Sequence, residues 1–168
     1  MERPRIKIRL TALDYIIEIA AFLSVLVAII LYIIYWTKAP EVVPTHYNIH
    51  GEVDGYGSKA TLLILPIITV VTYIGLTILN KYPHIFNFPA TVTEQNALSL
   101  YKIATRFVRV LKLLLCLLFT YIIWHEVRVI ITHQESQLGL IFGLLIMIIT
   151  FYPIFPIVKM IKKSKELG

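Results

Sequence analysis

Residues 15–36 read YIIEIAAFLSVLVAIILYIIYW, an apolar run of 22 residues with one charged side chain, Glu18. A helix needs about 20 consecutive apolar residues to cross the hydrocarbon of a bilayer, because each residue adds only about 1.5 Å. The run is longer than the apolar core of a cleavable signal peptide, and it ends in Tyr35 and Trp36 instead of small residues. We therefore predict a retained transmembrane helix at 15–36.

Three further segments have a comparable length and apolar character, at about 60–80, 107–128 and 138–158. The whole chain of 168 residues is 58% hydrophobic, more than is usual for a soluble domain. Charged residues crowd the ends of the third segment, which leaves a three-span arrangement with one interfacial run as the alternative. We predict an all-α protein, a four-helix transmembrane bundle that forms a single integral membrane domain over residues 1–168.

The basic residues predict how the chain crosses the membrane. Thirteen of the 16 Lys and Arg residues lie in the two tails or in the connection that leads into the third span, and only Lys38, Lys59 and Arg128 lie on the other side. Lys and Arg concentrate on the cytoplasmic side of membrane proteins. We predict a multi-pass protein of the cell membrane with both termini cytoplasmic. Because the cations flank apolar runs, the lipid bilayer explains the net charge of +6 and nucleic acid is not an expected partner.

The loop between the first two spans, residues 37–59, holds much of the polar information. Its two prolines and three glycines exclude a continuous helix, and Thr45 and Val53 suit strands. His50-Gly51 and Asp54-Gly55 are dipeptides typical of turns. We predict a small hairpin-like loop on the extracytoplasmic surface.

Two histidines and two carboxylates fall within nine residues of this loop, a composition that can bind zinc or copper. The candidate metal ligands are His46, His50 and Asp54. Their spacing matches no familiar zinc site, and a role of the Asn and Asp side chains in fixing turns is favoured. His125 and Glu126 end the third span on the same side, where they can join the loop in a shared polar cluster.

The same loop carries a family resemblance. Residues 44–59 fit the pattern P-x-H-[FY]-N-x-x-G-x-x-D-G-x-G-x-K, which resembles the SdpI-like family of bacterial membrane proteins, a domain of unknown function also found in an immunity protein against a secreted toxin. The motif residues here are Pro44, His46, Asn48, Gly51, Asp54, Gly55 and Lys59. A second stretch resembles a cytoplasmic motif of that family, through Phe86, Asn87, Pro89, Glu94 and Asn96.

The resemblance implies that the chain binds or senses an extracytoplasmic peptide or toxin, in immunity or signalling. The immunity protein is longer than this chain, so its repressor-binding role is not carried over. Two other functions stay open: a metal- or ion-binding membrane enzyme that uses the outer His, Asp and Glu residues, and an accessory subunit of a larger membrane complex.

Soluble catalytic motifs such as G-x-S-x-G, H-E-x-x-H or a glycine-rich phosphate loop are absent from the sequence, so an enzyme is the less favoured class. We expect no cofactor. The candidate partners are an extracytoplasmic peptide, another membrane protein or a second copy of the chain.

Two predictions concern the cytoplasmic side. A capping box starting at Thr91, or a cap at Thr93, is expected to begin a helix that continues into the third span. This helix can rest on anionic lipid or dock a cytoplasmic partner. Glu18 lies shallow in the first span, and we expect it to pair with Arg106, Arg109 or Lys112.

Overall fold

The computed structural model describes residues 3–48, 50, 52–132 and 139–167. Its helices and strands, in chain order, are α1 (Ala12–Trp36), β1 (Val42–Tyr47), β2 (Val53–Ser58), the 3-10 helix η1 (Lys59–Leu63), α2 (Ile64–Leu79), the 3-10 turn η2 (Pro83–Ile85), α3 (Ala97–Thr132), α4 (Gly139–Phe151) and α5 (Ile154–Leu167).

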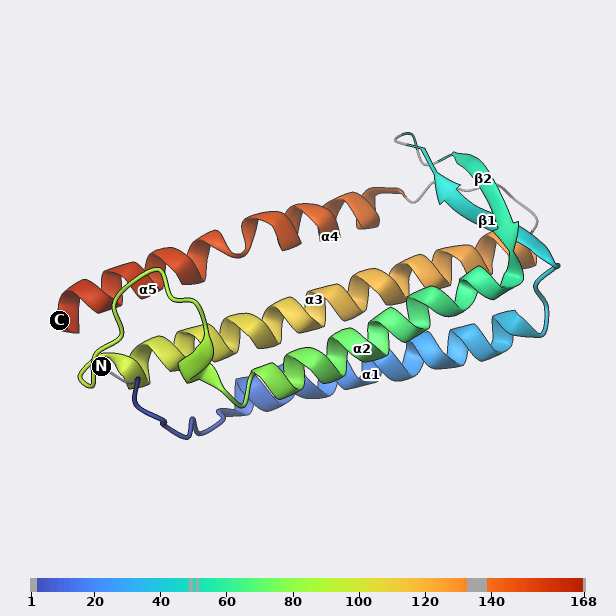
Figure 1. Cartoon of the computed structure of the whole chain (residues 1–168). Helices are drawn as coiled ribbons and strands as arrows, with labels where there is room; N and C mark the ends of the chain where they lie inside the picture. Colours follow the sequence, from blue (N-terminus) through green and yellow to red (C-terminus); the bar gives the residue numbers. More distant parts are fainter. Residues whose placement is uncertain (1–2, 49, 51, 133–138, 168) are drawn as a thin grey trace.

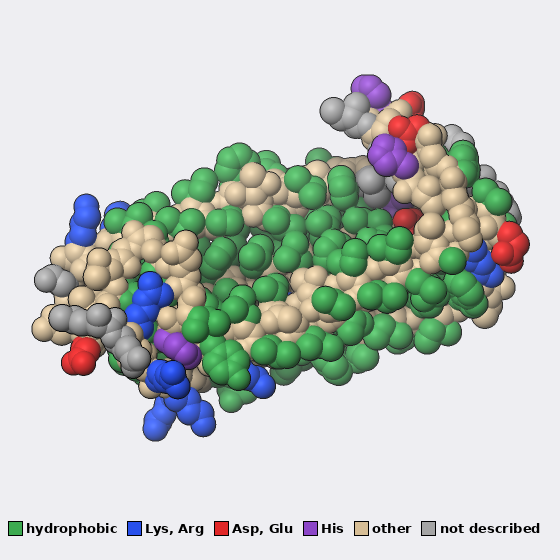
Figure 2. Space-filling model, in the orientation of Figure 1, with side chains coloured by type: hydrophobic (Ala, Val, Ile, Leu, Met, Phe, Trp, Pro, Cys, Tyr) green, Lys and Arg blue, Asp and Glu red, His purple; other side chains and the backbone are tan. Residues whose placement is uncertain are grey.

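Four helical stretches of the described chain are long and apolar enough to cross a membrane, at residues 12–36, 59–79, 97–132 and 139–167. This confirms the predicted four-helix arrangement. α1, α2 and α3 lie side by side, while α4 and α5 run along the outside of this group (Figure 1). The two termini lie together at one end, which we call the basic end, and β1 and β2 lie at the other, the hairpin end. Apolar side chains cover most of the visible length between them (Figure 2).

A capping box fixes the start of α1 three residues before the predicted span. The backbone N–H of Thr11 donates to Asp14 Oδ2 at 2.8 Å, and the backbone N–H of Asp14 donates to Thr11 Oγ1 at 3.3 Å. Each side chain thus satisfies a backbone donor that has no partner within the helix.

α3 is one continuous helix of 36 residues, considerably longer than the predicted span of 107–128. The cap at Thr93 is the one found: its backbone N–H donates to Asn96 Oδ1 at 2.9 Å, and Thr93 Oγ1 accepts from the backbone N–H of Asn96 at 3.3 Å. The helix predicted to lead from this cap into the third span is therefore confirmed.

The predicted fourth span, 138–158, falls on two successive helices that together continue beyond its predicted end. Leu138 lies outside the described residues, and the helix stops at Phe151 and starts again at Ile154. The helix breaks at Pro153, because a proline ring clashes with the preceding helical turn and a proline has no backbone N–H to donate. α5 then continues to Leu167, carrying Lys159 and further lysines beyond the apolar run.

The tightest packing joins α1 to α3. Ala21 and Ala28 are fully buried on α1, and Ser24 between them shares a 2.9 Å hydrogen bond with Thr120 of α3. Small residues let two membrane helices approach closely. Van der Waals packing then holds the helices together, because the hydrophobic effect does not drive helices to associate within lipid.

Candidate functional site

The hairpin is built on an antiparallel pairing of β1 and β2, in which Val42 faces Ser58 and Val43 faces Gly57. The register is irregular on both sides of His46. Val43 is fully buried and belongs to a core cluster with Leu62 of η1 and Val127 of α3. The hairpin is therefore fixed to the bundle.

Asn48 holds the turn of the hairpin. Its Oδ1 accepts from the backbone N–H groups of His50 at 2.9 Å and Glu52 at 3.0 Å, and its Nδ2 donates to Glu52 Oε2 at 2.9 Å. These bonds are the turn-fixing role predicted for an Asn at this position. Gly51, also part of the predicted motif, lies outside the described residues.

His46 Nδ1 and Asp54 Oδ1 are hydrogen-bonded to one another across the two strands. The side chain of His46 is 71% exposed and that of Asp54 is 42% exposed, so the pair lies at the surface of the hairpin.

β1 approaches β2 so closely that two positions of β2 have no room for a side chain and are occupied by glycine. A Cβ added at Gly57 would lie 2.8 Å from Thr45 Cγ2, and one added at Gly55 would lie 3.0 Å from His46 Cβ. Both distances are too short for an ordinary carbon–carbon contact. The glycines after Asp54 therefore create the space into which the facing strand packs its side chains.

The outward face of the hairpin carries exposed apolar side chains beside its polar ones. Val42 is 61% exposed and Tyr56, which faces Pro44 in the register, is 63% exposed. Lys59, the last motif residue, places its Nζ 4.7 Å from the centre of the Trp36 ring, which ties the end of the hairpin to the end of α1.

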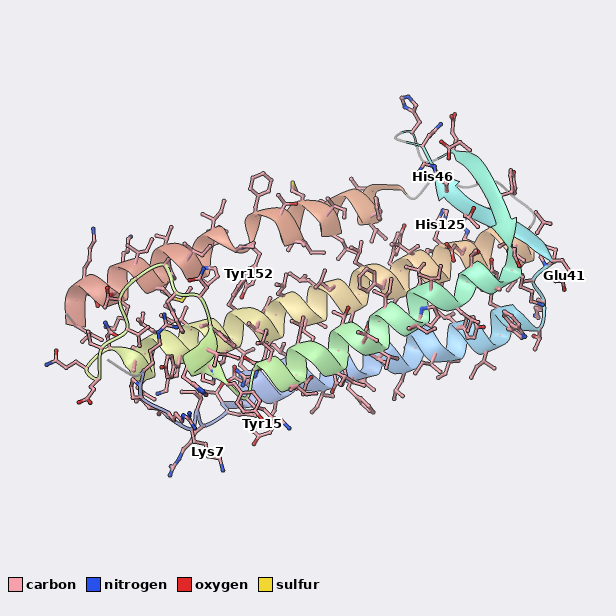
Figure 3. All side chains as sticks on the ribbon, in the orientation of Figure 1. Lys7, Tyr15, Glu41, His46, His125 and Tyr152 are labelled. Atoms are coloured by element: carbon pink, nitrogen blue, oxygen red, sulfur yellow. The ribbon has the colours of Figure 1, made fainter. Side chains whose placement is uncertain are left out.

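The predicted joining of this loop with His125 and Glu126 stays a prediction. His125 is buried in α3 and lies in the same region as His46 in Figure 3, while Glu126 is half-buried. Within the described part of the chain, no three His, Cys, Asp or Glu side chains are grouped so that they could hold a metal ion.

At the basic end, the second motif contains both buried and exposed residues. Asn96 is buried and, besides capping α3, donates to the Thr91 carbonyl at 3.1 Å and contacts Ser164 Oγ of α5 at 3.4 Å. Phe86 stacks with Phe88, with ring centres 6.3 Å apart. The remaining predicted motif residues are exposed: Asn87, Pro89 and Glu94.

Five charged side chains meet between α1 and α3 near the basic end, and we call them the charged layer. Arg106 Nε donates to Asp14 Oδ1 at 2.9 Å. Lys112 Nζ lies 2.5 Å from Glu18 Oε2, and Arg109 Nε lies 3.4 Å from Glu18 Oε1. The expected pairing of Glu18 is confirmed with two of its three candidate partners, while the third, Arg106, pairs with Asp14.

The N-terminal tail contributes a feature that the sequence analysis missed. Its basic residues are exposed and the residues between them are half-buried, in strict alternation from position 3 to position 10. Arg3 donates to the Phe86 carbonyl at 2.6 Å and lies over the Phe88 ring. The signal in the sequence is the alternation of basic and apolar residues, which is typical of an extended segment with one apolar side.

Comparison with known proteins gives a partial assignment. Residues 23–70, from the middle of α1 through the hairpin into α2, match a family model described as "Domain of unknown function (DUF1648)". An "Uncharacterized protein" of Archaeoglobus fulgidus is 41% identical over 63 residues. The match covers 33% of this chain and 34% of that protein, so the chain spans about a third of the length of this curated relative. No solved structure matches the chain at a significant level. The hairpin thus lies inside the segment that is similar to a domain of unknown function.

Proposed function

We propose that this membrane protein binds an extracytoplasmic peptide at its hairpin end, as a protective or sensing module of SdpI-like type. The observation that carries the proposal is the contrast between the two faces of the hairpin. Val43 is fully buried against the bundle, while Val42 and Tyr56 are both more than 60% exposed. A rigid support that presents exposed apolar and aromatic groups beside polar ones is the usual composition of a recognition surface.

The proposal includes an orientation, with the basic end in the cytoplasm and the hairpin end outside. The distribution of cations supports it, because only Lys38, Lys59 and Arg128 lie toward the hairpin end. A peptide secreted by the same or a neighbouring cell would then meet the hairpin without crossing the membrane.

The sheet favours a peptide in an extended conformation. Within the described residues the sheet consists of β1 and β2 alone, so each strand has an outer edge. Pro44 removes a backbone donor from β1, whereas Gly55 and Gly57 leave the backbone of β2 without side-chain bulk. A peptide can add as a third strand beside β2, using main-chain hydrogen bonds for affinity and Tyr56 for a side-chain contact.

A sensitivity assay tests this function. Cells without the chain, cells with the wild type and cells with the Val42→Ser/Tyr56→Ala variant are exposed to a panel of secreted membrane-active peptides. We expect the wild type to raise the tolerated concentration of at least one peptide several-fold, and the variant to abolish this protection. Tyr82→Ala, which removes an exposed aromatic residue at the basic end, is the matched control and should protect fully. Equal sensitivity of all four strains to the whole panel would contradict the proposal.

One observation supports a second role as an accessory subunit or as a protomer of a homo-oligomer. α4 has no buried residue within its described length, and Leu140 is 78% exposed. It runs along the outside of the α1–α3 group in Figure 1. A helix with so little internal packing offers a free surface to a neighbouring membrane protein. Purification in a mild detergent with measurement of the protein mass tests this role: a stoichiometric partner or second copy supports it, and a monodisperse monomer contradicts it.

A further inference from the structure

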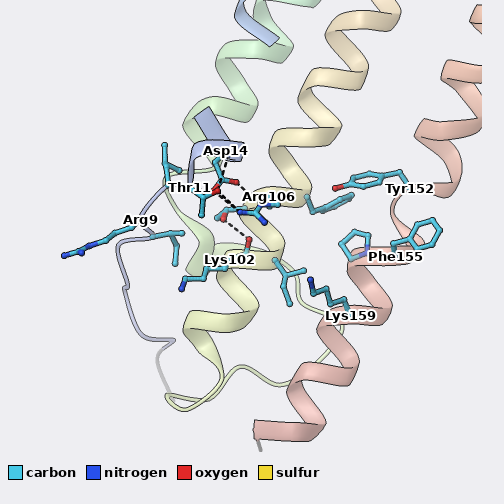
Figure 4. A pocket seen from close by; sticks show the side chains of 14 residues that line it. Arg9, Thr11, Asp14, Lys102, Arg106, Tyr152, Phe155 and Lys159 are labelled. Carbon is cyan, nitrogen blue, oxygen red and sulfur yellow. Dashed lines mark hydrogen bonds and ion pairs between the residues drawn. The ribbon is translucent and has the colours of Figure 1, made fainter. Parts of the chain in front are cut away.

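A hollow of about 520 Å³ lies at the basic end between the N-terminal tail, α3 and α5 (Figure 4). It is placed at the break between α4 and α5, where Tyr152, Phe155 and Pro156 form one wall. Phe107 of α3 forms part of the facing wall, and its ring centre lies 5.8 Å from that of Tyr152. The interior of the hollow is therefore lined by rings and aliphatic groups.

Four cations surround this apolar interior, and one acidic side chain, Asp14, lines it. Arg106 is already used, since it bonds to Asp14 at 2.9 Å and to Thr11 Oγ1 at 2.9 Å. The other three are Arg9, Lys102 and Lys159, all of which are exposed. None of these three forms an ion pair with a residue that the structure describes. The Arg9 side chain is directed away from the hollow in Figure 4, so Lys102 and Lys159 supply the unpaired positive charge of its rim.

A second hollow of about 530 Å³ adjoins the first, with Phe107 lining both. Its walls include Phe86 and Phe88 of the connection before α3, and Ile157 and Met160 of α5. Two apolar hollows of similar volume therefore share the side chain of Phe107 in their walls, and the basic rim belongs to the first.

We propose that these hollows bind one anionic phospholipid, whose phosphate contacts Lys102 and Lys159 and whose two acyl chains occupy the two hollows. Charge complementarity selects an anionic headgroup, because basic pockets beside membrane helices attract anionic lipids. The apolar walls select a ligand with hydrocarbon chains over a free anion, since a free phosphate gains nothing from contact with Phe155 or Met160. The site is separate from the hairpin, at the opposite end of the bundle (Figure 1).

Native mass spectrometry of the delipidated full chain tests the site. The protein is titrated with phosphatidylglycerol, with phosphatidylcholine and with inorganic phosphate. We expect one phosphatidylglycerol to bind per chain in a saturable way, with much weaker binding of phosphatidylcholine. Each cation near a membrane surface contributes about fivefold to the affinity for anionic lipid, so Lys102→Gln/Lys159→Gln should weaken binding about 25-fold.

A matched variant separates the site from general attraction to the basic end. Lys162→Gln/Lys165→Gln removes the same charge from the same end, but neither of its residues lines the first hollow. It should keep most of the affinity. Equal loss in the two double variants, both folded by circular dichroism, would overturn the proposal and leave only non-specific charge attraction.

The apolar half of the site has its own test. Phe155→Ala shortens one wall of the hollow at an exposed position and should weaken phosphatidylglycerol binding several-fold. If inorganic phosphate instead competes fully with the lipid, and Phe155→Ala leaves the lipid affinity unchanged, the site recognises an anion alone and the lipid assignment is wrong.

Discussion

Glu18 and Lys112 are 94 positions apart in the sequence and meet inside the bundle, with 2.5 Å between Glu18 Oε2 and Lys112 Nζ. Lys112 is fully buried and also donates to Thr77 Oγ1 of α2 at 2.7 Å. This single ammonium group therefore connects α1, α2 and α3. A buried charge is tolerated only when such partners replace its hydration.

The two residues of this pair should not be equivalent when they are mutated. Glu18→Leu leaves Lys112 without its described carboxylate partner, and we expect a loss of about 3 kcal/mol in the free energy of unfolding. Lys112→Met leaves Glu18 with Arg109 at 3.4 Å, so we expect a smaller loss of about 1 kcal/mol. Titration of each purified variant with a denaturing detergent measures its free energy of unfolding.

The double variant Glu18→Leu/Lys112→Met is the control for that pair. Removing both charges together leaves no uncompensated ammonium at position 112, and Arg109 keeps Asp14 at 3.9 Å, so the double variant should recover most of the lost stability. Additive losses in the double variant would show that the two side chains do not interact.

Replacement of Gly57 should loosen the hairpin. In Gly57→Ala the new methyl group would lie 2.8 Å from Thr45 Cγ2, and overpacking of this kind costs about 1–3 kcal/mol. Hydrogen–deuterium exchange of residues 42–58 should therefore become faster. Thr45→Ser removes the clashing methyl group and should restore slow exchange, whereas Gly75→Ala, which meets no atom within 4 Å, should leave the hairpin unchanged.

The hydrogen bond between Ser24 and Thr120 should contribute modestly to the packing of α1 on α3. Hydrogen bonds between membrane helices are worth about 0.6 kcal/mol on average, because the separated helices also find partners. A double-mutant cycle with Ser24→Ala and Thr120→Val should return a coupling energy of about that size. A coupling energy of zero would show that packing of the small residues alone holds this interface.

Thiol labelling of intact cells tests the proposed orientation. Cys116 is the single cysteine, and Cys116→Ala provides a background without thiols. In that background, a cysteine at Glu41 should react with a membrane-impermeant reagent from outside, and a cysteine at Glu94 should react only after permeabilisation; both positions are exposed. The reverse pattern would place the hairpin in the cytoplasm.

The sequence predicted the number and the approximate position of the spans, because hydrophobic length is a local property. The first two predicted spans, 15–36 and 60–80, agree with the structure within a few residues. The fourth, predicted to end at 158, lies on helices that continue to Leu167, because α5 starts directly after Pro153 and carries its lysines onward. Apolar content alone does not show where a charged, amphipathic helix stops.

The polar clusters were only partly predictable. The partners of Glu18 were predicted correctly, since depth in the membrane restricts them to a few cations at the same level. The bond between His46 and Asp54, by contrast, depends on an irregular strand register that neither residue encodes by itself. The hollow beside Phe107 was not foreseen, because it requires the tail, α3 and α5 to be placed relative to one another.

The length of α3 has a consequence for both ends of the protein. A helix of 36 residues extends about 54 Å, whereas the hydrocarbon of a bilayer is about 30 Å thick. α3 therefore projects beyond the hydrocarbon as a single stiff rod, with Val127 packed beneath the hairpin and Arg106 beside the first hollow. Any tilt of this rod would move both of its ends together, so the hairpin end and the basic end of the protein are mechanically linked by one helix.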